Sequence, residues 1–190
     1  WSTSSLPTIN NNRTFDGTGV SAFTSSITGL SPNITYYVRA YASNSFGTSY
    51  GNQLVLTTNP LTEPTINTSG VSSVTATTAL SGGNITSSGG AIVTQRGVCW
   101  STAANPTILN SRTNDGSGLG TFSSNVTGLN PNTTYYLRAY ATNSIGTSYG
   151  SQLIFNTTAT LPTITTNSIS SITQTAFTSG GNISNDGGSG

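Results

Sequence analysis

Very few side chains in this sequence could carry out catalysis. The chain has one cysteine, four acidic residues and no histidine. A cysteine nucleophile needs a neighbouring base, usually a histidine, and glycoside hydrolysis needs a pair of carboxylates. A calcium site likewise needs several carboxylates close together, which so few scattered acids do not supply. We therefore expect no enzyme activity, no metal site and no cofactor.

Most of the acidic residues stand in turns. Asp16, Asp115 and Asp186 are each followed by glycine. Asp-Gly pairs favour the positive backbone φ angles of tight hairpin turns. The sequence therefore assigns these carboxylates to turn formation rather than to a binding site.

Cys99 is open to two interpretations. A single thiol in a repeat cannot form a disulfide within its own domain. It acts either as a buried, small apolar side chain or as one half of a disulfide between chains in an oxidising compartment.

Charge is scarce along the whole chain. Charged residues make up 5% of the 190 residues and the net charge is +1, whereas an ordinary soluble domain is roughly 25% charged. There is no apolar run of the roughly 18 residues that a membrane-spanning helix needs. The basic residues are scattered, so no nucleic-acid partner is expected. They are Arg13, Arg39, Arg96, Arg112 and Arg138.

The most informative feature is an internal repeat. The segment GLSPNITYYVRAYASNSFGTSYG, from Gly29, matches GLNPNTTYYLRAYATNSIGTSYG, from Gly128, at 18 of 23 positions with an offset of 99 residues. SGGNITSSGG at Ser81 matches SGGNISNDGG at Ser179 with an offset of 98. Such periodicity indicates an array of repeated units. The chain is predicted to contain the back of one repeat (1–58), one complete repeat (59–158) and the front of a third (159–190).

The first residue, Trp1, falls inside a repeat. We therefore expect the chain to be a segment of a longer array, in which about seven residues lead from Gly190 to the tryptophan of the next repeat. We also expect residues 168–183 to pair with a neighbouring copy of residues 1–58, head to tail.

Each repeat has the size of a β-sandwich domain. No window shows a 3.6-residue periodicity; short β-branched and aromatic runs are bounded by Gly, Pro, Asn and Asp. The sequence therefore predicts an all-β protein of tandem immunoglobulin-like sandwiches, about 99 residues per repeat. In the complete repeat, seven strands are expected: 65–68, 73–85, 92–101, 107–113, 120–127, 134–143 and 151–157.

The segment TYYLRAYAT has a clear apolar face. Alternation places Tyr135, Leu137 and Ala139 on the buried side of the strand. With the preceding GLNPNT, this segment resembles the fibronectin type III domain, in which G-L-x-P-x-x-x-Y leads into the sixth strand. The resemblance implies a tyrosine corner, meaning a buried ring whose hydroxyl bonds to upstream backbone, at Tyr135 and at Tyr36 in the first copy.

The repeat is also similar to the tandem repeats of large secreted and cell-surface proteins of Bacteroidota. Those repeats contain RGVCWST, DGxG and PNTTYYxRAYAxN segments in the same order. The fibronectin type III resemblance covers the second half of each repeat well and the first half poorly. The family's core tryptophan stands on the second strand, whereas Trp100 here stands on the third.

Two orientations are open for the strand that contains RGVCW. Val98 and Trp100 point inward in the favoured one, since they bury the larger apolar area, and Arg96 reaches water at the end of the sheet. The other orientation creates an exposed aromatic and arginine face suited to stacking on a sugar or a neighbouring domain. This contact face would comprise Arg96, Trp100, Tyr136, Arg138 and Tyr140.

Two functions follow from these features. The first is a structural segment of a long extracellular tandem-repeat stalk or filament, a surface fibre or adhesin of a bacterium, in which the repeat provides length and stiffness. Its partners would be other copies of the chain or adjacent repeats. The second is a carbohydrate-binding or spacer module of a secreted polysaccharide-processing protein, with surface polysaccharide as the partner.

Overall fold

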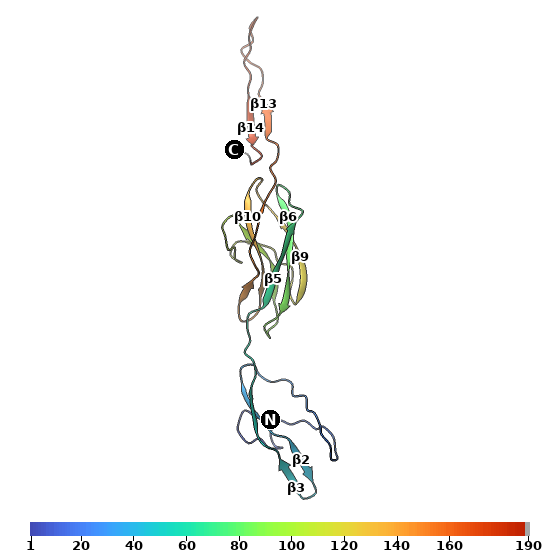
Figure 1. The fold of residues 1–190 in the computed structure, drawn as a ribbon. Helices are drawn as coiled ribbons and strands as arrows, with labels where there is room; N and C mark the ends of the chain where they lie inside the picture. The colour runs from blue at the N-terminus through green and yellow to red at the C-terminus, as the bar shows by residue number, and fades with distance from the viewer. Residues whose placement is uncertain (189–190) are drawn as a thin grey trace. The chain divides into compact units, whose positions relative to one another are not determined.

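The computed structural model describes residues 1–188, which form strands and no helix. Consequently, no helix among these residues could cross a bilayer. The chain divides into two compact units, Trp1–Leu61 and Thr62–Gly190 (Figure 1). The expected connection from Gly190 to a following repeat lies outside the described residues.

The second unit contains an antiparallel sandwich. One sheet has three strands in the order β5-β6-β9, and the other has five, in the order β11-β10-β7-β8 with β12 also paired to β10. The strands are β5 (Thr65–Ser72), β6 (Thr78–Ser87), β7 (Gln95–Ser101), β8 (Ser111–Arg112), β9 (Gly120–Thr127), β10 (Thr134–Thr142), β11 (Thr147–Tyr149) and β12 (Leu153–Asn156).

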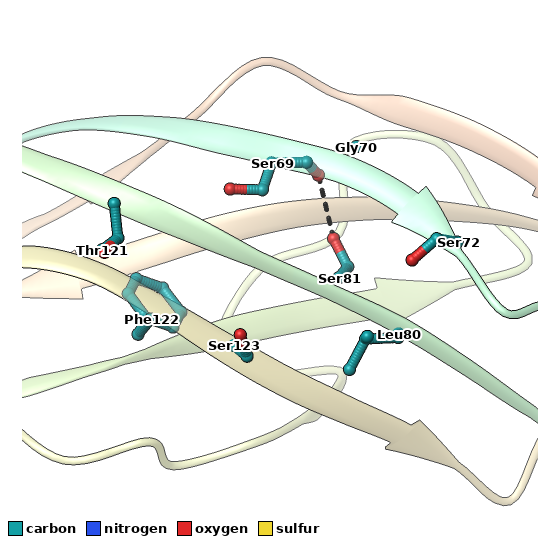
Figure 2. A pocket seen from close by; sticks show the side chains of 8 residues that line it. All are labelled: Ser69, Gly70, Ser72, Leu80, Ser81, Thr121, Phe122 and Ser123. Atoms are coloured by element: carbon teal, nitrogen blue, oxygen red, sulfur yellow. Dashed lines mark hydrogen bonds between the residues drawn. The ribbon is translucent and has the colours of Figure 1, made fainter.

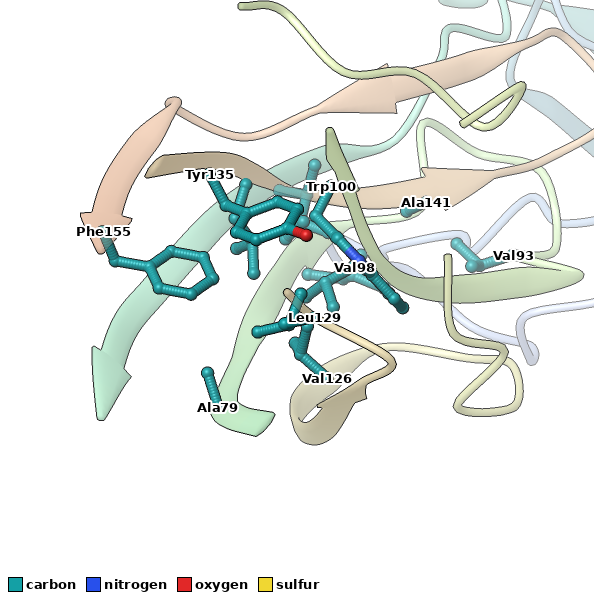
Figure 3. Packing of buried hydrophobic residues seen from close by; sticks show 13 residues of the cluster. Ala79, Val93, Val98, Trp100, Val126, Leu129, Tyr135, Ala141 and Phe155 are labelled. Carbon is teal, nitrogen blue, oxygen red and sulfur yellow. The ribbon is translucent and has the colours of Figure 1, made fainter. Parts of the chain in front are cut away.

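The two sheets enclose one apolar core (Figure 3). From the five-stranded sheet, Leu137 of β10 lies opposite Trp100 of β7 in the pairing register. From the three-stranded sheet, Ile85 of β6 and Val126 of β9 join the same cluster. Alternate residues of each strand face the same way. The chain therefore has the all-β sandwich fold that the sequence predicted.

Strand boundaries differ from the predicted ones where local turns interrupt the ladder. Strand β6 starts only at Thr78, because the Thr75 amide donates to the Thr78 carbonyl at 2.9 Å. The predicted strand 107–113 is reduced to the short β8, because the Asn110 amide turns back to the Thr107 carbonyl at 3.0 Å. Strand β11 forms in the GTSY segment, to which no strand was assigned from sequence.

The first unit contains the back half-repeat, residues 1–58. Its strands form two two-stranded sheets, in which β1 (Thr35–Val38) pairs with β4 (Leu54–Thr57) and β2 (Tyr41–Asn44) pairs with β3 (Gly47–Tyr50). These strands match β10, β11 and β12 at the offset of 99. Residues 21–28, which correspond to β9, form no strand. In the complete repeat β9 pairs with β6, and residues 1–58 contain no equivalent of β6.

The front half-repeat, residues 159–188, follows the sandwich. Its strands β13 (Thr163–Thr166) and β14 (Gly181–Asn185) pair with each other, as β5 and β6 do. Every residue of both strands is exposed. The front half-repeat thus presents both faces of its hairpin to solvent.

Candidate functional site

The tyrosine corner of the complete repeat joins β10 to the segment before it. The Asn130 amide donates to the Tyr135 hydroxyl at 3.0 Å, and the Tyr135 ring is buried. The ring stacks on Phe155 with 5.9 Å between centroids (Figure 3). In the back half-repeat, the Ser31 amide donates to the Tyr36 hydroxyl at 3.1 Å. This is the arrangement that the resemblance implied at both tyrosines.

Trp100 does not lie on an exposed contact face. Its side chain is 8% exposed and belongs to the core, as does Val98, which is fully buried. The structure thus has the inward orientation that the larger apolar area favoured.

Arg96 is held at the end of the same strand. Its guanidinium donates to the carbonyls of Gly118 and Leu119 at 3.3 and 2.9 Å. It also lies over the Phe122 ring, 5.2 Å from its centroid. Arg96 therefore fastens the loop before β9 to the sheet and is half-buried.

Tyr140 is also absent from the surface, contrary to the outward face drawn from sequence. Its side chain points away from the core but is 0% exposed. Its hydroxyl donates to the Thr113 carbonyl at 2.6 Å, because the connection between β7 and β9 folds over this side of the sheet. Burial raises the pKa of this hydroxyl above its usual value. Strand alternation alone could not reveal that a loop covers the outer face.

The same connection encloses Cys99. The sulfur is fully buried and donates to the Pro106 carbonyl at 3.4 Å. Burial raises the pKa of the Cys99 thiol to about 11. The structure therefore agrees with a small apolar role, and the sulfur is out of reach of a second chain in the folded state.

Besides Arg96, the half-buried part of the expected contact face consists of Tyr136 and Arg138. The Arg138 guanidinium lies 4.6 Å from the centroid of the Tyr149 ring and donates to the Gly150 carbonyl at 3.1 Å. The Tyr149 hydroxyl accepts from the Ile108 amide at 3.1 Å. Arg138 and Tyr149 are consequently engaged with each other within the repeat.

The arginine contact recurs in the back half-repeat. Arg39 lies 4.6 Å from the Tyr50 centroid and donates to the Gly51 carbonyl at 3.0 Å. The Tyr50 hydroxyl accepts from the Ile9 amide at 3.0 Å. The repeated residues thus form the same local contacts twice.

Two of the Asp-Gly turns each contain a small hydroxyl–carboxylate cluster, in which two side-chain hydroxyls donate to the aspartate carboxylate. Asp115 accepts from the Thr113 hydroxyl at 2.7 Å and from Ser124. Asp16 accepts in the same way from Thr14 at 2.7 Å and Ser25 at 2.5 Å. Hydrogen bonds from Ser25 and then Thr14 lower the pKa of Asp16.

Metal ligands are not gathered anywhere in the described part of the chain. Residues 1–188 contain no group of three or more His, Cys, Asp or Glu side chains that could hold an ion. Asp186, the third Asp-Gly aspartate, accepts from the Gly188 amide at 2.8 Å in a local turn.

A shallow groove crosses the three-stranded sheet (Figure 2). It measures about 460 Å³, and the Ser81 hydroxyl within it donates to the Ser69 carbonyl at 3.0 Å. The sequence reasoning missed this groove, whose only signal is a series of serines and threonines on adjoining strands. Its lining is Ser69, Gly70, Ser72, Leu80, Ser81, Thr121, Phe122 and Ser123.

No protein-family model matches the chain, and no curated protein matches its sequence. The chain is similar to the sensor domain of the anti-sigma factor RsgI4 in Pseudobacteroides cellulosolvens, with 22% identity and a TM-score of 0.40 over 52% of this chain and 98% of that one. It is also similar to the FN1–FN3 domains of chicken CNTN1, with 18% identity and a TM-score of 0.40 over 68% of this chain and 45% of that one. A third similar structure contains domains d3–d4 of the rat CD45 extracellular region, with 13% identity and a TM-score of 0.40 over 77% of this chain and 76% of that one. At these levels of similarity, the fold assignment rests on the strand topology itself.

Proposed function

We propose that the chain is a structural segment of a long extracellular stalk or filament built from tandem β-sandwich repeats. The observation that carries this proposal is the repetition of the sandwich-building sequence. Residues 29–51 recur at 128–150 with 18 of 23 positions identical. Both copies form the tyrosine corner and the arginine–tyrosine contact. In this proposal each repeat adds length and stiffness, and the chain has no catalytic role.

The segments between repeats support a mechanical role. Residues 57–65 (TTNPLTEPT) and 157–163 (TTATLPT) are short and contain proline. Proline restricts the backbone and makes linkers extended and semi-rigid. Such segments would limit the bending between successive sandwiches.

The low charge supports association with other copies. Charged residues are 5% of the chain and the net charge is +1. Self-repulsion between copies is therefore weak, which permits close packing of many chains at a cell surface.

The positions of the aromatic residues do not favour the carbohydrate-binding alternative. Stacking on a sugar requires exposed ring faces, but Trp100 lies in the core and Tyr140 lies beneath a loop. Tyr149 is covered on one face by Arg138.

Electron microscopy of the native source, with antibodies raised against this chain, tests the proposal. Labelled, beaded surface fibres are the expected result. Labelling confined to compact secreted particles would contradict it. A glycan array probed with the chain provides the complementary test, on which we expect no specific binding.

A further inference from the structure

The linker that follows the complete repeat is hydrogen-bonded on both sides of the repeat boundary. On the upstream side, the Asn132 amide of the complete repeat donates to the Thr158 carbonyl at 3.1 Å. On the downstream side, the Thr160 amide donates to the Gly187 carbonyl at 2.9 Å. Only Ala159 stands between the two anchored threonines. The linker therefore has almost no free length in which the chain could bend.

The downstream bond also occurs one repeat earlier in the chain. The Thr62 amide donates to the Gly89 carbonyl at 2.9 Å, and these residues are the equivalents of Thr160 and Gly187. The two glycines have positive φ angles, 68° at Gly89 and 74° at Gly187. A Cβ on Gly89 would lie 2.1 Å from the Thr62 carbonyl oxygen, and a Cβ on Gly187 would lie 1.8 Å from that of Thr160. Glycine is therefore required in both turns by the close approach of the linker.

In the complete repeat, the Asn143 side chain binds the same linker. Its amide nitrogen donates to the Thr62 carbonyl at 2.7 Å and to the Ser88 carbonyl at 2.9 Å. Its amide oxygen accepts from the backbone amides of Ile145 and Gly146. Asn143 is 5% exposed, and a buried amide with these bonds satisfied holds a fixed geometry. The linker that enters the complete repeat is thus fastened to the β6–β7 turn and to the β10–β11 turn.

The second glycine of the downstream turn contacts the complete repeat directly. The Asn132 side-chain amide donates to the Gly188 carbonyl at 2.5 Å. A Cβ on Gly188 would lie 2.7 Å from the Pro131 carbonyl oxygen and 2.9 Å from the Asn132 Cβ. Gly188 also has a positive φ of 81°. The Pro131–Asn132 turn of the complete repeat therefore lies against a two-glycine turn that admits no larger residue.

The sequence contains the same two turns at the previous repeat boundary. Asn33 is the equivalent of Asn132, and Gly90 is the equivalent of Gly188. The φ angles of Asn33 and Asn132 are 55° and 47°, and those of Gly90 and Gly188 are 84° and 81°. Asparagine is one of the few residues besides glycine that adopt this left-handed conformation readily. The asparagine turn and the two-glycine turn thus recur with the same residues and the same backbone conformation.

We propose that the Gly187–Gly188 turn is a docking surface for the complete repeat that precedes it, and that this contact fixes the angle between consecutive repeats. Gly187 binds the linker, and Gly188 receives the asparagine turn, with Asn132 as the positioning residue. This inference rests on the proposed stalk function and assigns its stiffness to a direct contact at the repeat boundary in addition to the linker prolines.

Double electron–electron resonance between two spin labels tests the proposal in the 190-residue chain. Thr127→Cys places one label at an exposed position of β9, and Thr166→Cys places the other at an exposed position of β13. Cys99 is buried and stays unlabelled in the folded chain. We expect one narrow distance distribution. Asn132→Asp should widen it about twofold or more, because a carboxylate repels the Gly188 carbonyl instead of donating to it and frees the boundary to bend.

Matched variants separate this contact from local strain and from added charge. Asn132→Gly tolerates the positive φ but lacks the donor, so it should widen the distribution as Asn132→Asp does. Asn130→Asp adds the same charge at an exposed position of the same turn and should not. Gly188→Ala should widen the distribution, whereas Gly116→Ala should not, because a Cβ at Gly116 meets no atom within 4 Å although its φ is 94°. Urea unfolding of each variant checks that the complete repeat stays folded.

A broad distribution in the unmodified chain would overturn the proposal. Widths that Asn132→Asp and Gly188→Ala leave unchanged would overturn it as well, and so would equal widening by the Asn130 and Gly116 controls. The spin labels report the angle within one chain, whereas the micrographs report fibres at the cell surface. A failure here therefore leaves the stalk proposal to the micrographs.

Discussion

Equivalent residues of the complete repeat and of the back half-repeat differ sharply in burial. Phe155 is 9% exposed, and its equivalent, Leu56, is 40% exposed. Residues 120–127 form β9, whereas residues 21–28 form no strand. The two regions match at 18 of 23 positions over residues 29–51 and 128–150, and the complete repeat also includes a front half that residues 1–58 do not contain. That half supplies β5 and β6, two of the three strands of the second sheet of the sandwich.

The contacts that survive in the back half-repeat are made within that half, and they include both the tyrosine corner and the bond from the Ile9 amide to the Tyr50 hydroxyl, which joins residues 41 positions apart. The two residues of each tyrosine-corner hydrogen bond are 5 positions apart, in both copies. By contrast, the contact between Ala139 and Thr68 joins residues 71 positions apart and requires the front half. Turns and corners therefore form from short-range sequence, while the core depends on chain closure over long distances.

Hydrogen exchange should show the largest difference between the two regions. Amides of β9 are held in the ladder with β6, so they should exchange only through global opening, about a thousandfold or more slower than unprotected amides. Amides of residues 21–28 should exchange close to the unprotected rate in dilute solution. Mass spectrometry of peptides from both regions measures this. Equal protection in a dilute, monomeric sample would show that the back half-repeat closes its core alone.

Removal of a core side chain should affect only the complete repeat. Leu137 is 0% exposed and lies opposite Trp100. Leu137→Ala should lower the free energy of unfolding of the complete repeat by about 2–5 kcal/mol through lost burial and a cavity. Val38→Ala, the same position in the back half-repeat, is the matched control and should leave that transition unchanged. Urea unfolding followed by tryptophan fluorescence reports the effect, and equal losses from both substitutions would contradict it.

Features of this fold that depend on neighbouring residues could be predicted from the sequence, and features that depend on distant residues could not. Strand alternation predicted the inward Leu137, and the resemblance to the fibronectin type III segment implied the tyrosine corner; both depend on a few neighbouring residues. Strand alternation could not predict the burial of Tyr140, which depends on a loop that begins many residues earlier and folds over the outer face. The inward Trp100 could be favoured only by apolar area, since RGVCW has apolar residues on both faces.

The thiol of Cys99 tests whether the complete repeat is closed. Burial raises its pKa from 9.0 to about 11. At pH 8 the thiolate fraction should fall about 100-fold, and the buried sulfur should react with a thiol reagent only on unfolding. Modification rates measured with and without urea check this. Rapid reaction of the native chain would mean that the β7–β9 connection does not cover the sulfur.

The tyrosine corner should contribute a smaller amount of stability. Tyr135→Phe removes the hydroxyl that accepts from the Asn130 amide and should cost the complete repeat about 1–2 kcal/mol. Tyr36→Phe removes the equivalent bond from the Ser31 amide in the back half-repeat. It should accelerate exchange of that amide without changing the unfolding of the complete repeat. An unchanged unfolding free energy for Tyr135→Phe would rule out a stabilising corner.

The smallest expected effect concerns the hydroxyl–carboxylate cluster of the back half-repeat. Hydrogen bonds from Ser25 and Thr14 lower the pKa of Asp16 below its ordinary value of 3.8. A lowered folded pKa means that the cluster stabilises the turn above the ordinary pKa and that this contribution is lost as the pH falls through the lowered pKa. Ser25→Ala should raise the Asp16 pKa toward its ordinary value, and Ser26→Ala, at a neighbouring exposed serine, should not. An NMR titration of the Asp16 carboxyl carbon separates the two. Ser25 aligns with Ser124 of β9, but residues 21–28 form no strand. A normal Asp16 pKa in the unmodified chain would therefore show that the hydroxyl–carboxylate cluster forms only where this segment is paired in a sheet, as β9 is in the complete repeat.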